Sequence, residues 1–229
     1  MIFPTQKLNV YFKNNDPLKG IISVWGDFGV GKTTFALQTA INSVKIGKQV
    51  VYIYTKPNFP YEKISMIQKD SFKILDKITF IQTTDFDELN SIVFNFEFLI
   101  LQYLQESNIN FNLIVIDSLT NLYRIELNKD KKEKNYNLNY QLDQILANLF
   151  YINETYDIEI MIINEISRKN FDDQNIEVHS GGKVMKYWVD FSIKITRTEK
   201  LNERKFILTK DPGIELNSFK SILTENGFE

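Results

Sequence analysis

The chain has no cysteine and a single histidine, His179, among its 229 residues. Without cysteine there can be no disulfide, no thiolate metal ligand and no cysteine nucleophile. A single histidine excludes a metal centre built from several imidazoles. A functional site must therefore be built from backbone amides, carboxylates, hydroxyls and basic side chains.

Long apolar runs and a surplus of one charge are also missing. The first residues lack the pattern of a secretory leader, and no apolar run reaches the roughly 18 residues that a membrane span needs. We therefore expect a cytoplasmic protein with no membrane contact. The formal net charge of −2 gives no overall positive field, so any contact with nucleic acid depends on a local patch.

The composition that remains is typical of a folded globular protein. Hydrophobic residues make up 43% of the chain and charged residues 24%. The length fits one α/β domain, and no linker rich in Pro, Gly or Ser and no repeat divides it. We predict a single domain over residues 1–229.

Short apolar runs rich in β-branched residues alternate with longer stretches of helical spacing. The runs cover residues 21–25, 49–55, 78–82, 111–117 and 158–164, and the helical stretches cover 33–45, 85–105 and 138–156. This alternation predicts a mainly parallel, twisted sheet flanked by helices on both faces.

The pattern changes after Gly182. The segments "WVDFSIKITR" and "RKFILTK" are separated by a polar stretch, which predicts an antiparallel C-terminal hairpin that closes the sheet. Two other polar stretches, residues 128–135 and 167–182, predict loops.

The stretch "GDFGVGKT", residues 26–33, matches the full G-x-x-x-x-G-K-[ST] pattern between a predicted strand and a predicted helix. Its glycines let backbone N–H groups turn inward toward phosphates, and the helix start adds partial positive charge. The alternative is a glycine-rich turn without a ligand. We predict ATP binding by Gly26, Asp27, Phe28, Gly29, Val30, Gly31, Lys32, Thr33 and Thr34.

Two of the candidate residues have the chemistry of magnesium ligands. The hydroxyl of Thr33 follows the phosphate-loop lysine, and Asp117 ends the apolar strand of "LIVIDS". We expect Thr33 and Asp117 to hold Mg²⁺, the aspartate through water. The alternative for Asp117 is a cap on the following helix.

Four segments carry a family resemblance: "WGDFGVGKTTFALQTA" (25–40), "LIVIDSLTNLYRIEL" (113–127), "MIINE" (161–165) and "GGKVMKYWVDFSIKITR" (181–197). Together they resemble the RecA/RadA recombinase superfamily, most closely its small archaeal paralogue branch, RadB. The resemblance implies a RecA-like P-loop NTPase core and a role in recombination or repair. Full-length recombinases carry an N-terminal helical domain, for which residues 1–20 leave no room.

The resemblance also reveals two charge changes at the expected ATP site. In "YIYTKP" (52–57), Lys56 stands where the superfamily has the glutamate that activates water, and Glu165 stands where it has a glutamine that senses the γ-phosphate. An ammonium cannot accept a proton from water, and general-base help is worth roughly 10²- to 10⁴-fold in rate. Hydrolysis is therefore expected to be weak or absent, and no catalytic residue is assigned.

We expect Lys56 and Glu165 to form an ion pair near the γ-phosphate. The alternatives are that Lys56 is solvated or that it reaches the phosphates directly. An active ATPase would require another acid, Glu62 or Glu165, as the base.

Two further lysines have counterparts in the superfamily. Lys63 stands where an arginine packs on adenine, although an ordinary surface lysine is an equal alternative. Lys210 follows the last strong strand, from which cations reach a neighbouring subunit's ATP in a homo-oligomer. Asp211 and Pro212 would then cap the base.

The two predicted loops correspond in position to DNA loops of the superfamily. The first contains Lys129, Lys131, Lys132 and Lys134, and the second Arg168, Lys169, Asp172 and Asp173. Mixed charges and few aromatics allow only weak contact with single-stranded DNA, and solvated loops are the alternative.

These features together imply an ATP-binding accessory protein of recombination whose partner is a recombinase, another protein or, weakly, single-stranded DNA. The alternative is a KaiC-like regulatory or scaffold ATP-binding protein that does not act on DNA. Aromatic residues, at 14%, allow for a protein interface.

Overall fold

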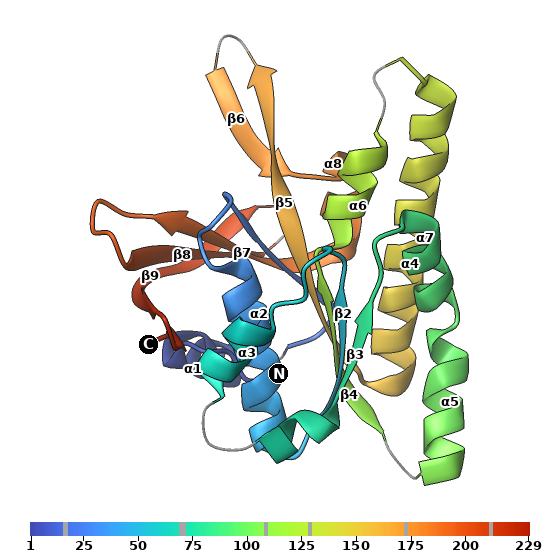
Figure 1. The fold of residues 1–229 in the computed structure, drawn as a ribbon. Coiled ribbons are helices and arrows are strands. Elements are labelled where there is room, and N and C mark those ends of the chain that lie inside the picture. The colour runs from blue at the N-terminus through green and yellow to red at the C-terminus, as the bar shows by residue number, and fades with distance from the viewer. Residues whose placement is uncertain (16–17, 69–71, 108–109, 128–129, 172–173, 211–212) are drawn as a thin grey trace.

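The computed structural model describes residues 1–15, 18–68, 72–107, 110–127, 130–171, 174–210 and 213–229. Its strands form one ten-stranded sheet in the order β10-β9-β8-β7-β1-β5-β4-β2-β3, with β6 paired to β5 outside this path (Figure 1). The strands are β1 (Ile21–Gly26), β2 (Gln49–Tyr54), β3 (Ile78–Gln82), β4 (Phe111–Asp117), β5 (Glu159–Phe171), β6 (Gln174–His179), β7 (Val189–Arg197), β8 (Glu203–Lys210), β9 (Ile214–Thr224) and β10 (Gly227–Phe228).

The central strands run parallel and the C-terminal strands antiparallel. The pairs β1–β5, β1–β7, β4–β5, β2–β4 and β2–β3 are parallel, whereas β7–β8, β8–β9 and β9–β10 are antiparallel. The predicted α/β class, the mainly parallel sheet and the C-terminal hairpin are therefore confirmed.

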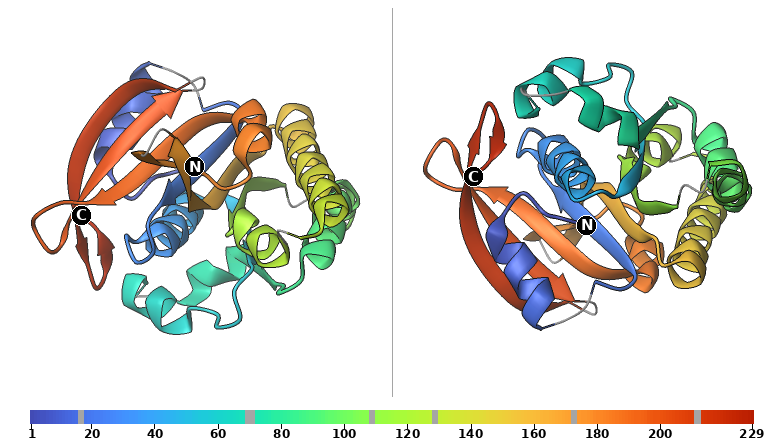
Figure 2. Two further views of the ribbon diagram at one scale, coloured as in Figure 1. Left: turned by 90° about the horizontal axis from the view of Figure 1, so that it is seen from above. Right: turned by 90° about the horizontal axis from the view of Figure 1, so that it is seen from below.

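Helices cover both faces of the sheet (Figure 2). One face carries α1 (Gln6–Asn14), α2 (Lys32–Lys45) and α3 (Tyr61–Ile67), and the other carries α4 (Phe86–Phe94), α5 (Phe96–Ser107), α6 (Leu119–Glu126), α7 (Lys132–Tyr156) and α8 (Gly182–Trp188). Along β2, Val50 and Tyr52 pack into the first layer, and Val51 and Ile53 pack into the second. This alternation follows from the two-residue period of a strand.

The single helix expected over residues 85–105 is wrong, because two helices meet at Asn95. The Asn95 side chain donates to the Ser91 carbonyl oxygen at 2.8 Å, and its backbone N–H binds the same carbonyl at 3.1 Å. An asparagine that satisfies helical carbonyls in this way favours a helix end.

Both loop predictions need correction. In the first stretch, 128–135, helix α7 begins at Lys132, and residues 128–129 lie outside the described part of the chain. In the second, 167–182, the strands β5 and β6 pair from Ile166–His179 to Phe171–Gln174 and project beyond the sheet (Figure 1). The sequence of this stretch is mostly polar and charged, so the hydrophobic alternation that predicts a strand is absent.

Helix α1 and strands β9 and β10 were not predicted from the sequence. Helix α1 is held by aromatic packing, with Phe3 and Phe12 stacked at 5.4 Å between ring centroids. Strand β9 is held by Phe219, which stacks on Phe206 at 5.1 Å. Among the described helices, none is long and apolar enough to cross a bilayer.

Candidate functional site

The phosphate loop connects β1 to α2 at the carboxyl end of the central strand. Gly26 and Gly31 have φ angles of +145° and +104°. A Cβ atom at Gly26 would lie 2.2 Å from the Ile195 carbonyl oxygen, and one at Gly31 would lie 2.8 Å from the Phe228 ring. Gly31 caps α2 without a side-chain hydrogen bond, so the first helical amides keep their capacity to bind an anion.

Two arginines from distant strands hold the loop. Arg168 Nη2 lies 2.8 Å from Asp27 Oδ1, and Arg197 Nη2 donates to the Phe28 carbonyl oxygen at 2.8 Å. The Phe28 ring itself is 91% exposed at the tip of the loop. The loop is therefore fixed through its backbone and Asp27, while its tip faces solvent.

Lys32 is folded back onto its own loop. Its ammonium donates to the carbonyl oxygens of Gly26 and Asp27 at 2.8 and 2.9 Å and lies 3.2 Å from Glu165 Oε2. The side chain is only 6% exposed. The charge that would meet a phosphate is thus neutralised by Glu165.

Asp117 is fully buried and has a donor at each carboxylate oxygen. The hydroxyl of Tyr52 donates to Oδ2 at 3.0 Å, and Lys56 Nζ lies 3.5 Å from Oδ1. Lys56 Nζ also lies 3.8 Å from Glu165 Oε1, so the contact expected between these two residues is present. The order Lys32, Glu165, Lys56, Asp117 forms a chain of alternating charge, which we call the charge cluster.

The protonation states follow from the surroundings. Burial, with the charge of Asp117 added, raises the pKa of Tyr52 well above its usual value, so Tyr52 is a neutral donor. Burial alone would lower the pKa of Lys56, but Asp117 and Glu165 outweigh it and raise that pKa above its usual value. Lys56 is therefore charged at neutral pH.

An open cavity of about 820 Å³ lies beside the loop and the charge cluster. It is lined by Asp27, Phe28, Lys56, Pro57, Asn121, Arg124, Ile125, Glu165, Ile166 and Arg168. This space lies at the carboxyl ends of parallel strands, where open α/β sheets bind ligands.

The remaining candidate residues for the ligand lie at several places. Thr33 and Thr34 are in the first turn of α2, beside the loop. Lys63 and Glu62 lie on α3, outside the set of described residues that line the cavity. Lys210 ends β8 and lies over the Phe191 ring at 5.3 Å, and residues 211 and 212 are outside the described part.

Mg²⁺ fits the charge cluster poorly. A magnesium ion needs oxygen ligands with free lone pairs in an octahedral arrangement. Both oxygens of Asp117 face donors, and the donor at Oδ1 is itself a cation. Within the described ranges, no three acidic, histidine or cysteine side chains gather in a metal-binding group. A magnesium ion held by the expected pair, Thr33 and, through water, Asp117, would lie against the Lys56 ammonium.

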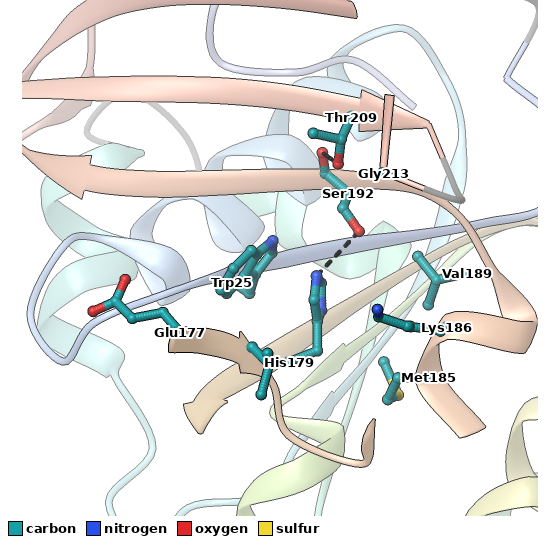
Figure 3. Close-up of a pocket in the computed structure, with 10 residues that line it drawn as sticks. Trp25, Glu177, His179, Met185, Lys186, Val189, Ser192, Thr209 and Gly213 are labelled. Atoms are coloured by element: carbon teal, nitrogen blue, oxygen red, sulfur yellow. Dashed lines mark hydrogen bonds between the residues drawn. The ribbon is translucent and has the colours of Figure 1, made fainter. Parts of the chain in front are cut away.

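A second, smaller cavity of about 230 Å³ lies near the same end of β1 (Figure 3). Its wall includes Trp25, whose ring centroid is 4.2 Å from that of His179, and Ser192, whose hydroxyl lies 3.3 Å from His179 Nε2. The Asn164 amide lies 3.3 Å from His179 Nδ1. Asn164 precedes Glu165 on β5, so neighbouring residues of one strand contribute to both sites.

His179 is neutral in this setting. Burial, together with the charges of Lys186 and Lys194, lowers its pKa to about 4. The oxygen of the Asn164 amide faces the Thr120 hydroxyl, which leaves its NH₂ group to donate to Nδ1. His179 therefore carries its proton on Nε2, toward Ser192.

Of the residues predicted for DNA contact, those that the structure describes are divided between the start of α7 and the β5–β6 hairpin. Lys131, Lys132 and Lys134 lie exposed at the start of α7, and Lys134 Nζ is 3.3 Å from Glu126. Arg168 is engaged by Asp27 and, at 3.6 Å, by Glu177. Lys129, Asp172 and Asp173 lie outside the described residues, as does the side chain of Lys169.

Sequence reasoning missed two residues that shape the site. Tyr52 is one of several apolar strand residues, and no pattern distinguishes the tyrosine that binds Asp117. Arg197 ends β7, and only the pairing of β7 with β1 brings it to the phosphate loop. The alternation of faces along β2 and β4 was the one signal that could have paired Tyr52 with Asp117.

Comparison with known proteins supports one family over nearly the whole chain. A sequence profile of the Rad51 family matches residues 16–227. A protein of Methanocaldococcus jannaschii named "DNA repair and recombination protein RadB" is 34% identical over 214 residues, which cover 92% of this chain and 93% of the relative. Proteins of the same name from Methanococcus maripaludis strain C5 and Methanobrevibacter smithii are each 30% identical, over 97% and 86% of this chain and 96% and 81% of their own lengths. The chain therefore belongs to the Rad51 family of RecA-like proteins, within which it is similar to archaeal RadB.

Proposed function

We propose that this chain is an ATP-binding accessory protein of DNA recombination and repair that holds ATP and hydrolyses it very slowly or not at all. The names of its relatives support the process, and the phosphate loop supports the ligand. In this proposal residues 1–229 act as one RecA-like domain. ATP lies along residues 26–34, with its triphosphate facing the charge cluster.

One observation carries the proposal of slow hydrolysis: the carboxylates of Glu165 and Asp117 are each paired with a lysine, and that of Asp27 with Arg168. Glu165 lies within 4 Å of Lys32 and Lys56, and Asp117 lies within 4 Å of Lys56. A general base must be free to accept a proton from water within hydrogen-bond reach. A carboxylate that faces an ammonium is a weaker base, and Lys56 is no base while it is charged.

The same arrangement supports retention of ATP. Phosphate oxygens compete with Glu165 for Lys32 and add charge-assisted hydrogen bonds with the loop amides. ATP at a hundred times its Kd adds ~2.7 kcal/mol to the free energy of unfolding. Nucleotide should therefore raise the melting temperature without turnover.

The proposal is tested by measuring ATP binding and phosphate release on the same purified sample. The expected result is saturable binding with phosphate release near background. The double variant Lys56→Glu, Glu165→Gln should raise turnover by roughly 10²-fold, because it supplies a free carboxylate. Fast phosphate release by the wild-type chain, or failure to bind ATP, contradicts the proposal.

We also propose a recombinase partner and weak, ATP-dependent contact with single-stranded DNA. The exposed lysines at the start of α7 and the projecting β5–β6 hairpin support this part. Capture on single-stranded DNA at increasing salt, with and without ATP, tests it, because phosphate contacts give a steep salt dependence. Absence of capture at low salt favours the regulatory or scaffold alternative without DNA.

A further inference from the structure

The Asp117 carboxylate is buried and already has a cation beside it. The side chain is 0% exposed, and its two oxygens face the Tyr52 hydroxyl at 3.0 Å and the Lys56 ammonium at 3.5 Å. Tyr52 is a neutral donor, so one full positive charge, that of Lys56, lies against this buried carboxylate. A divalent ion at Asp117 would have to displace that charge or lie against it.

Hydrogen bonds to the backbone of Lys56 and Pro57 hold Lys56 in this position. The Gln82 side chain donates to the carbonyl oxygens of Lys56 and Pro57 at 2.9 and 2.8 Å. Gln82 ends β3, which is parallel to β2, so the segment after β2 is tied to the sheet edge. The path of the backbone at Lys56 is thus fixed by strand β2 before it and by the hydrogen bonds from Gln82 on β3.

Lys56 also borders the space that the nucleotide would occupy. It lines the cavity of about 820 Å³ together with Asp27 and Glu165, and its side chain is 29% exposed. An ammonium in this place can donate to a phosphate oxygen while it stays near Asp117. A bound metal ion is then not required between the negative charges of the triphosphate and those of Asp117 and Glu165.

We propose that Lys56 takes the place of a divalent cation, so that this chain binds nucleoside triphosphate without Mg²⁺. The inference rests on the proposed function, in which ATP occupies the phosphate loop. Lys32 and Lys56 then contact the triphosphate, and Tyr52 remains as the partner of Asp117. Glu165 lies between the two lysines and keeps both close to the phosphates.

The test is the Kd for ATP, measured by isothermal titration in excess EDTA and again in excess Mg²⁺. The wild-type chain should give equal affinities in the two buffers. Lys56→Met keeps an unbranched side chain of similar bulk and removes its charge, so binding in EDTA should weaken by about tenfold or more, the usual worth of a charged hydrogen bond. Mg²⁺ should restore the affinity of this variant, because no ammonium then lies at Oδ1 of Asp117.

Lys48→Met is the matched control. Lys48 is 27% exposed, pairs with Glu159 at 2.7 Å and lies at the opposite end of β2. Its variant should bind ATP as the wild-type chain does in both buffers.

Each outcome decides a separate point. A wild-type chain that binds ATP only with Mg²⁺ overturns this inference and leaves ATP binding intact, whereas no binding in either buffer overturns the proposed function itself. Binding by Lys56→Met that stays independent of Mg²⁺ removes Lys56 from the role. The wild-type comparison decides the inference even if Lys56→Met fails to fold.

Discussion

Strand β2 has a lysine just before it and another just after it, and the two are held differently. Lys48 and Lys56 are nearly equal in exposure, at 27% and 29%. At the amino end, Lys48 Nζ lies 2.7 Å from Glu159, which the amino group of Met1 also contacts. At the carboxyl end, Lys56 lies 3.5 and 3.8 Å from two carboxylates and borders a cavity.

The difference shows that exposure alone does not identify a functional charge. One carboxylate at the amino end, that of Glu159, receives two amino groups at short range, which leaves little for a ligand to gain. The carboxyl end spreads two lysines over two carboxylates at longer range, which leaves both ammonium groups capable of closer contacts. Longer ion-pair distances beside a cavity therefore distinguish the carboxyl end of β2, where we propose ligand binding, from its amino end.

The largest expected difference between the two ends is in ATP affinity. Lys32→Met should weaken ATP binding by about 100-fold, because a buried, charge-assisted contact with phosphate is worth about 3 kcal/mol. Lys48→Met should leave the Kd unchanged. Titration calorimetry of the two variants measures the difference, and equal effects would remove the functional contrast between the ends.

Acid should act at the carboxyl end through His179. The pKa of His179 is lowered from 6.5 to about 4, so the folded state binds this proton less well than the unfolded state does. Its contribution to stability is full above pH 6.5 and is lost as the pH falls toward 4, on the order of 3 kcal/mol. Urea unfolding of wild type and His179→Gln across this range should show the difference between them shrinking in acid. A constant difference would show that His179 does not titrate as its surroundings imply.

The free energy of unfolding, measured without nucleotide, should also differ between variants of the two lysines. Lys56→Met leaves the buried Asp117 with Tyr52 alone and should cost about 2 kcal/mol in the free energy of unfolding, allowing for the partial exposure of Lys56. Lys48→Met leaves Glu159 with the Met1 amino group as a partner and should cost less than about 1 kcal/mol, because Lys48 is partly exposed. Urea denaturation measures both values, and the reverse order would contradict the description of the two ends.

The smallest predicted effect of a change at the site concerns the Tyr52 hydroxyl, which donates to Asp117 of the charge cluster. Tyr52→Phe removes the donor to Asp117 Oδ2 and should cost about 1 kcal/mol of stability. Tyr54→Phe is the control on the same strand, because the Tyr54 hydroxyl makes no hydrogen bond within the described part of the chain. The same denaturation experiment should show the Tyr54 variant close to wild type.

The sequence predicted the central fold well because its signals are local. The parallel strands are continuous apolar runs, and the phosphate loop has its residues in one short segment, so both could be recognised without knowledge of the fold. The β5–β6 hairpin was missed because its side chains are mostly charged and polar. Strand β9 was missed because its support, Phe206, comes from another strand.

The charge cluster was only half predictable. The resemblance brought Lys56 and Glu165 together, but the contact between Lys56 and Asp117 depends on strand order. Strand β4 lies between β2 and β5, and Tyr54 is paired with Asp117 across β2 and β4. Lys56 follows Tyr54 by two residues, so its ammonium lies near Asp117 as well as near Glu165.

The position of Trp25, directly before Gly26 and against the His179 ring, gives the molecule an optical reporter of its own. The sequence has one other tryptophan, Trp188, which packs against Phe150 on the α7–α8 side of the sheet. Intrinsic fluorescence can thus follow the filling of the neighbouring loop without any attached dye.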